Sequence, residues 1–169
     1  ELKIQGIANL VRLEAKAANR EGGSEVTIRD LIRSALRMLP DRIIVGEVRG
    51  GETVDMLQAL NTGHEGSLST AHANSSRDML SRLETMTLMG VELPLEAIRR
   101  QIASGVDILI HLGRMRDKSR KVLEITEVCG FEEGEIKTNV LYQWKEGEGL
   151  IKLANLLNRE KLERAGIVL

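Results

Sequence analysis

The 169-residue sequence has few of the residues that mark several common classes of protein. Its single cysteine, Cys129, excludes a disulfide within the chain and fits a reducing compartment. One Trp, one Tyr and one Phe provide too little aromatic surface for a base-stacking platform. A formal net charge of −1 argues against a generally electropositive nucleic-acid-binding protein. No apolar run approaches the length of a membrane-spanning helix.

Several catalytic motifs are also absent. The sequence has no Gly-Lys pair, and therefore no G-x-x-x-x-G-K-[ST] loop to hold the phosphates of a nucleotide. It has no G-x-S-x-G elbow to position a serine nucleophile. Cys129 has no basic residue or histidine beside it in the sequence, which argues against a thiol nucleophile and favours a core position. Three histidines and one cysteine, scattered as they are, do not form a metal-ligand cluster of the usual spacing.

Apolar periodicity and turn residues predict alternating strands and helices up to about residue 112. Thr27 and Asp30 have the spacing of a capping box at the start of a helix that Pro40 ends. The predicted helices cover residues 28–39, 52–60, about 76–86 and 94–104, and the predicted strands cover residues 10–13, 43–45 and 67–70. This alternation is typical of an α/β fold with a parallel core, in which the strand at 43–45 is buried on both faces.

The pattern changes at Asp107. Strands are predicted at residues 108–112, 122–128 and 136–144. No helical pattern separates them, so they are expected to pair antiparallel as a meander at one edge of the sheet. A glycine-containing link at 146–149 and a short helix around 159–164 complete the chain.

Two glycine-punctuated segments carry the candidate site. Residues 42–52 form a short apolar run that ends in Glu47 and then turns on glycines, and residues 62–74 carry His64 and His72. An acid at the carboxyl end of a buried strand lies where parallel sheets place ligands, and a histidine ending the next strand faces the same crevice. The alternative is that Glu47 points to solvent and that His72 is a structural histidine. His64 is interpreted as a brace for the turn.

These two segments resemble the Walker B and His-box elements of the secretion ATPases, the motors of type II and type IV secretion and of pilus assembly. The resemblance runs from about residue 10 to 142 and is closest to the Flp/Tad-type pilus-assembly ATPases. The similar sequence segments are residues 26–31, 34–38, the strand that ends at Glu47, and residues 61–64, 83–86 and 101–104.

The resemblance assigns roles to individual residues. It implies that Glu47 holds the magnesium shell through water and polarises the attacking water, and that His72 reaches the terminal phosphate. Arg49 is taken as a further catalytic residue. Arg12 resembles the arginine on the strand after the family's Asp box, and Glu1 resembles the last acid of that box. Both are therefore expected near the nucleotide.

A ring-shaped motor completes each site with an arginine donated by the neighbouring subunit. The candidates in this sequence are Arg12, Arg29, Arg33 and Arg49. The spacing of Arg29, Arg33 and Arg37 is equally typical of a solvated helix face, so the sequence does not choose among them.

The resemblance further implies a fold and an assembly. It implies the C-terminal portion of a RecA-like P-loop NTPase core at residues 1–145, starting just after the phosphate-binding loop, with a tail at 146–169. ATP and Mg²⁺ are the expected cofactors. The expected partners are five further copies in a hexamer and an inner-membrane platform protein, with the motor cytoplasmic and peripheral to the membrane, and no nucleic acid is expected. Two alternatives stay open: an ATPase for conjugation or effector secretion, and a catalytically inactive fragment or degenerate partner subunit that lacks the P-loop lysine.

Overall fold

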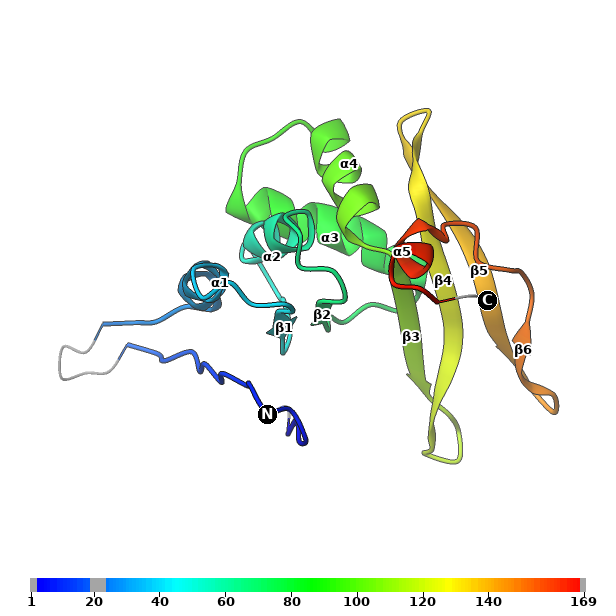
Figure 1. The fold of residues 1–169 in the computed structure, drawn as a ribbon. Helices are drawn as coiled ribbons and strands as arrows, with labels where there is room; N and C mark the ends of the chain where they lie inside the picture. Colours follow the sequence, from blue (N-terminus) through cyan, green and yellow to red (C-terminus); the bar gives the residue numbers. More distant parts are fainter. Residues whose placement is uncertain (1–2, 19–23, 168–169) are drawn as a thin grey trace. The chain divides into compact units, whose positions relative to one another are not determined.

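The computed structural model describes residues 3–18 and 24–167 (Figure 1). They form two compact units: Glu1–His72 with Thr85–Glu92, and Ala73–Glu84 with Leu93–Leu169. The helix α3 (Ser76–Gly90) contributes its first part to the second unit and its last part to the first unit. Among the described residues, no helix combines the length and the apolar character needed to cross a membrane.

In the first unit, α1 (Ile28–Leu36) begins with the predicted capping box. The backbone N–H of Asp30 donates to Thr27 Oγ1 at 3.2 Å, and the backbone N–H of Thr27 donates to Asp30 Oδ2 at 3.0 Å. The helix ends three residues earlier than predicted, because a residue that precedes proline is disfavoured in the helical region. Leu39, which precedes Pro40, has φ 53°. The start of the helix is therefore confirmed, and its predicted end is corrected.

The predicted parallel pairing is also present in the first unit. The strands β1 (Ile44–Val45) and β2 (Leu68–Ser69) pair in parallel, with Ile44 opposite Leu68. Val45 is 8% exposed, whereas Ile44 is 41% exposed and Leu68 is 62% exposed. Since side chains alternate along a strand, only the face of Val45 is covered. The expectation of a strand buried on both faces is therefore wrong for the part of the chain that is described.

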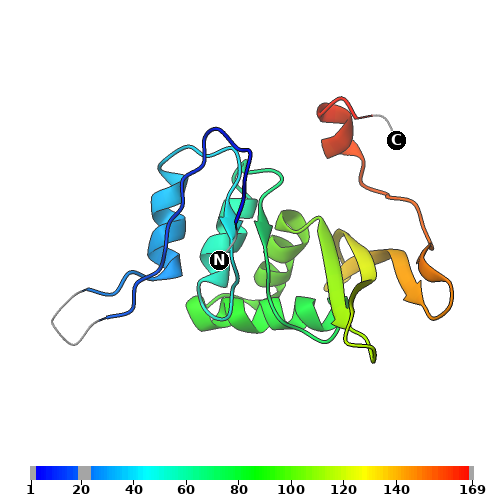
Figure 2. The same cartoon turned by 90° about the horizontal axis from the view of Figure 1, so that it is seen from below.

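The helix α2 (Thr53–Leu60) joins these strands and packs against α1 (Figures 1 and 2). The strand expected at 10–13 is absent from the described structure. Residues 3–18 form one isolated bridge, from Lys16 to Val26, and neither helix nor strand elsewhere. Leu10 and Val11 are 37% and 61% exposed, so this apolar run meets no neighbouring strand that could order it.

The second unit is built on an antiparallel sheet of order β3-β4-β5-β6, visible as long hairpins in Figure 1. Its strands are Ile108–Arg114 (β3), Arg120–Glu132 (β4), Glu135–Lys145 (β5) and Gly149–Lys152 (β6). The helix α4 (Leu95–Gly105) packs on β4 and β5 and buries Ile98 and Ile102 completely. The antiparallel meander is confirmed, but it forms a sheet of its own rather than an edge of the parallel sheet. The strand β6 lies where the sequence predicted only a link and tail.

A buried acid, Glu127, fixes the chain that follows β6. Its carboxylate accepts hydrogen bonds from the backbone N–H groups of Leu157 and Asn158, at 3.0 and 2.7 Å, and from Asn139 Nδ2 at 3.0 Å. The short helix α5 (Glu160–Arg164) follows directly. Burial alone would raise the pKa of Glu127, but the hydrogen bonds of Asn158, Leu157 and Asn139 outweigh it and lower the pKa. Glu127 is therefore ionised where it binds the tail.

We expect Glu127→Ala to release this tail, because two backbone N–H groups lose their acceptor at a cost of about 1–3 kcal/mol each. Hydrogen exchange at the amides of Leu157 and Asn158 measures the loss. Since folding lowers the pKa of Glu127, its contribution is complete above the pKa of the unfolded chain and disappears as the pH falls through the folded pKa. Glu127→Gln keeps one acceptor oxygen and should retain part of the protection. Unchanged exchange in the alanine variant would contradict the assignment.

Candidate functional site

The structure brings Glu47 and His72 together at the carboxyl ends of β1 and β2. Beyond the two strands the parallel pairing continues in single contacts. The backbone N–H of Val48 donates to Thr70 O at 2.9 Å, and Thr70 Oγ1 donates to Gly46 O at 2.5 Å. These contacts hold the two strand ends side by side. As a result, His72 Nε2 lies 3.4 Å from Glu47 Oε2.

Arg49 completes this cluster from the other side of the carboxylate. Its Nη2 donates to Glu47 Oε1 at 2.6 Å. The side chains of Arg49 and His72 are 73% and 81% exposed, whereas that of Glu47 is 25% exposed. The two outer groups therefore face solvent, and the carboxylate lies between them. Three residues that the sequence singled out, from the segments that follow two different strands, thus share one cluster.

The hydrogen bond from Arg49 lowers the pKa of Glu47, and the charges of Arg49 and His72 add to that effect against the opposing effect of burial. Glu47 Oε2 is buried and faces His72 Nε2 at 3.4 Å, and no other described residue donates to it. The site therefore presents an ionised carboxylate with one oxygen tied to Arg49 and the other beside His72.

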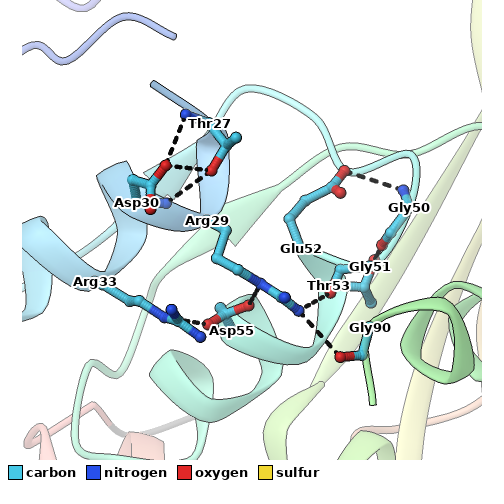
Figure 3. A network of polar contacts seen from close by, with 10 residues as sticks. All are labelled: Thr27, Arg29, Asp30, Arg33, Gly50, Gly51, Glu52, Thr53, Asp55 and Gly90. Carbon is cyan, nitrogen blue, oxygen red and sulfur yellow. Dashed lines mark hydrogen bonds and ion pairs between the residues drawn. The ribbon is translucent and has the colours of Figure 1, made fainter. Parts of the chain in front are cut away.

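The glycine turn at Gly50 and Gly51, drawn in Figure 3, directly follows Arg49 in the sequence. Glu52 Oε1 accepts hydrogen bonds from the backbone N–H groups of Arg49 and Gly50, at 2.6 and 3.0 Å. Burial would raise the pKa of Glu52, but the N–H groups around it lower the pKa overall. Gly51 and Gly90 pack backbone against backbone: a Cβ on Gly51 would lie 2.8 Å from the Cα of Gly90. These glycines are therefore required by space and not by an unusual φ.

Asp55 holds the arginine that binds the same turn, and sequence reasoning missed this role of Asp55. Its carboxylate accepts from Arg29 Nε at 2.5 Å and from Arg33 Nε at 3.0 Å, and its side chain is only 4% exposed (Figure 3). Arg29 Nη2 also donates to Gly51 O at 3.0 Å and to Gly90 O at 3.3 Å. We name Arg29, Asp55, Gly51 and Gly90 the arginine clamp. The available signal was an acid inside an apolar helix, with two arginines four residues apart on the preceding helix.

The arginine clamp bears on the choice of an arginine that acts on a neighbouring subunit. Arg29 and Arg33 are both held by Asp55 within the chain, which weighs against either of them reaching a second copy. Arg12 donates to Ile4 O at 2.7 Å, within residues 3–18, and this contact does not join it to Glu47. Glu1, the remaining residue expected near the nucleotide, lies outside the described residues.

The other histidines and the cysteine have local environments. His64 Nδ1 lies 3.1 Å from Ala59 O, which agrees with its interpretation as a brace for the turn after α2. His111 lies on β3 opposite Glu124. Burial, followed by the charge of Glu127, raises the pKa of the Cys129 thiol. A raised pKa disfavours the thiolate, in agreement with the expectation that Cys129 is not a nucleophile.

The described residues contain no group of three or more His, Cys, Asp or Glu side chains that could hold a metal ion by themselves. Mg²⁺ does not need such a cage, because it commonly keeps several waters and is bound by one or two carboxylates and the phosphates of a substrate. Glu47 Oε2, whose one near donor among the described residues is His72 Nε2 at 3.4 Å, fits a single ligand of that kind, direct or through water.

Comparison with known proteins places the chain in a family. The model of the family described as "Type II/IV secretion system protein" matches residues 1–148. A Mycobacterium tuberculosis (strain ATCC 25618 / H37Rv) protein named "Putative conjugal transfer protein" is 45% identical over 139 residues, 82% of this chain and 39% of its own length. The conjugal transfer protein TrbB of Rhizobium radiobacter is 36% identical over 143 residues, 85% of this chain and 43% of its own. This chain thus spans about two fifths of the length of these relatives.

A solved structure is also similar. It is the VirB11 ATPase from the Brucella suis type IV secretion system in complex with sulphate, with a TM-score of 0.56 and 39% sequence identity. The likeness covers 59% of this chain and 31% of that chain.

Proposed function

We propose, from the premise that this chain belongs to the type II/IV secretion system protein family, that it is the later part of an ATPase motor domain. The observation that carries the proposal is the cluster of Glu47, Arg49 and His72 at the carboxyl ends of two parallel strands. The complete domain would have a RecA-like core. Its reaction would be the hydrolysis of ATP to ADP and phosphate, coupled to secretion or pilus assembly.

Three residues of this chain have separate roles in the proposed hydrolysis. Glu47 stays ionised, and its Oε2, beside His72, would hold a water of the magnesium shell and orient the attacking water. Arg49 keeps the other oxygen of Glu47 fixed and keeps its pKa low. His72, exposed beside Glu47, would contact the terminal phosphate. Magnesium, when bound with the nucleotide, would neutralise charge on the phosphate oxygens.

The remaining parts of the machine belong to the same proposal. The phosphate-binding loop would lie upstream of residue 1, and six copies would form a ring on the cytoplasmic side of the inner membrane, against an integral platform protein. The sequence of residues 26–38 and 101–104 favours a motor that assembles a Flp/Tad-type pilus. The names of the two relatives favour conjugal transfer instead. Other proteins of the machine would determine which cargo is moved.

A second candidate function has one observation in its favour, the absence of a Gly-Lys pair from the sequence. It is a non-hydrolysing partner subunit of such a machine. Magnesium-dependent ATP hydrolysis by the full-length protein, beside this 169-residue segment at equal concentration, separates the two. Turnover in the long chain alone supports a motor whose phosphate loop lies upstream. A long chain that assembles into a ring without turnover would establish the partner subunit instead.

His72→Ala in the full-length protein is expected to lower ATP turnover by about tenfold or more while changing nucleotide affinity little. The side chain is 81% exposed and lies beside Glu47, so its removal leaves no buried cavity. Phosphate release and ATP binding measure the two quantities. His64→Ala is the matched control, because His64 braces the preceding turn and does not contact Glu47 in the described structure. No change in either quantity would return His72 to a structural role.

A further inference from the structure

The turn between β3 and β4 concentrates positive charge at one end of the second sheet. We define the basic tip as residues 114–121, and its exposed cations are Arg114, Arg116, Lys118 and Arg120. Figure 1 shows this turn at the end of the long β3–β4 hairpin. Within the described structure none of these four side chains forms an ion pair, and Lys121 lies over the ring of Trp144 at 5.3 Å.

The basic tip is a preformed turn whose only acid is already engaged. Asp117 Oδ1 accepts from the backbone N–H of Ser119 at 2.9 Å and from Ser119 Oγ at 2.6 Å, and these bonds lower the pKa of Asp117. The backbone closes the turn between Met115 and Ser119 at 2.8 Å. Asp117 therefore shapes the turn and does not neutralise the neighbouring cations by pairing with them.

Acids gather at the other end of the same sheet. The β4–β5 turn carries Glu132, Glu133 and Glu135, all exposed; Glu133 lies 3.8 Å from Lys137, and the charge of Glu135 acts on Arg99. A chain with a formal net charge of −1 thus separates its charges along the hairpins. The basic tip is a local electropositive surface that the net charge conceals.

Exposed apolar side chains lead into the basic tip. Ile110 and Leu112 are 57% and 66% exposed, and they alternate along β3 on the face that continues to Arg114. β3 is also an edge strand of the sheet. Cations beside exposed apolar groups suit the surface of a bilayer with anionic lipids, where the cations meet phosphates and the apolar groups enter the interface.

We propose that the basic tip binds an anionic phospholipid surface directly. This goes beyond the proposed function, in which the membrane is reached through a platform protein, and it does not depend on ATP hydrolysis. Nucleic acid fits the surface less well, because the sequence has three aromatic residues and the ring of Trp144 is already covered by Lys121. A projecting turn also suits a broad surface better than the groove that an acidic peptide requires.

The test is sedimentation of the full-length protein with vesicles. Vesicles that contain phosphatidylglycerol should bind the protein, and pure phosphatidylcholine vesicles should bind it far less. Arg116→Gln/Lys118→Gln is expected to weaken binding to the anionic vesicles by about 25-fold, from roughly fivefold for each cation removed. High salt should weaken binding further, since surface charges are screened. Both substituted side chains are exposed, so the fold should be retained, as circular dichroism can verify.

Arg77→Gln/Arg82→Gln is the matched control, because it removes two exposed cations of α3 and changes the net charge equally. It should bind anionic vesicles like the unchanged protein. Equal loss in the control would overturn the proposal in favour of a general charge effect. Unchanged binding in the tip variant would overturn it directly. A tip variant that fails to assemble without vesicles would assign the tip to contact between copies. ATP turnover without vesicles should be the same in both variants, which separates this result from the fate of the proposed function.

Discussion

Glu47→Gln in the full-length protein is expected to lower ATP turnover by about 10²-fold or more and to leave nucleotide binding largely intact. The amide keeps the shape of the side chain and can still accept the hydrogen bond of Arg49. It cannot supply the negative charge that orders a coordinated water and polarises the attacking one. Magnesium-dependent phosphate release measures turnover, and titration with ATP under non-hydrolysing conditions measures binding.

Glu65→Gln is a control for that experiment, because Glu65 is an exposed acid of the turn before β2 and lies outside the cluster. It should leave turnover unchanged. If Glu47→Gln weakens nucleotide binding to the same degree as turnover, Glu47 is a binding residue and the catalytic assignment is wrong. If neither quantity changes, the cluster is structural.

Local signals in the sequence were sufficient for many elements of the fold. Thr27 and Asp30, three positions apart, form a capping box, and Pro40 prevents continuation of α1 through backbone sterics alone. The meander at residues 108–145 follows from strands with no helix between them. Signals that need a neighbouring strand were less reliable: residues 10–13 have the composition of a strand, but the described structure provides no partner for them.

The candidate site shows the same division. Glu47 and His72 were predictable because both follow strands, and the ends of neighbouring parallel strands meet at one edge. The role of Asp55 was not predictable from the sequence. It depends on how α1 packs against α2, which brings together two residues that are 26 positions apart. The tail-binding role of Glu127 depends on contacts 30 residues away in the same manner. The sequence shows an acid in one helix and two arginines on the helix before it, but it does not specify that they pair.

The arginine clamp links packing to the site. Arg29 contacts Asp55 and the carbonyl groups of Gly51 and Gly90, so one side chain joins α1, α2, the glycine turn and the end of α3 (Figure 3). The glycine turn begins one residue after Arg49, and Glu52 within it binds the backbone N–H of Arg49. Disruption of the clamp should therefore affect both the stability of α2 and the position of Arg49 beside Glu47.

Asp55→Ala is expected to destabilise the first unit by about 3 kcal/mol, the lower end of the range for breaking a buried ion pair. The lower end applies because the side chains of Arg29 and Arg33 are 33% and 62% exposed and regain water when Asp55 is lost. Hydrogen exchange in the full-length protein, at the amides of Thr53 and Val54 that bind the carbonyl groups of Gly50 and Gly51, measures the free energy of local opening.

Two further variants serve as controls for Asp55→Ala. Asp55→Asn keeps acceptor and shape without the charge, so it should lose less protection than Asp55→Ala and should retain more ATP turnover. Asp41→Ala removes an exposed acid of the same unit and should stay within about 0.5 kcal/mol of the unchanged protein. If Asp55→Ala exchanges no faster than Asp41→Ala, the arginine clamp does not stabilise the turn. If it exchanges faster but retains full turnover, the clamp stabilises α2 without positioning Arg49, because catalysis by Glu47 would then be independent of the glycine turn.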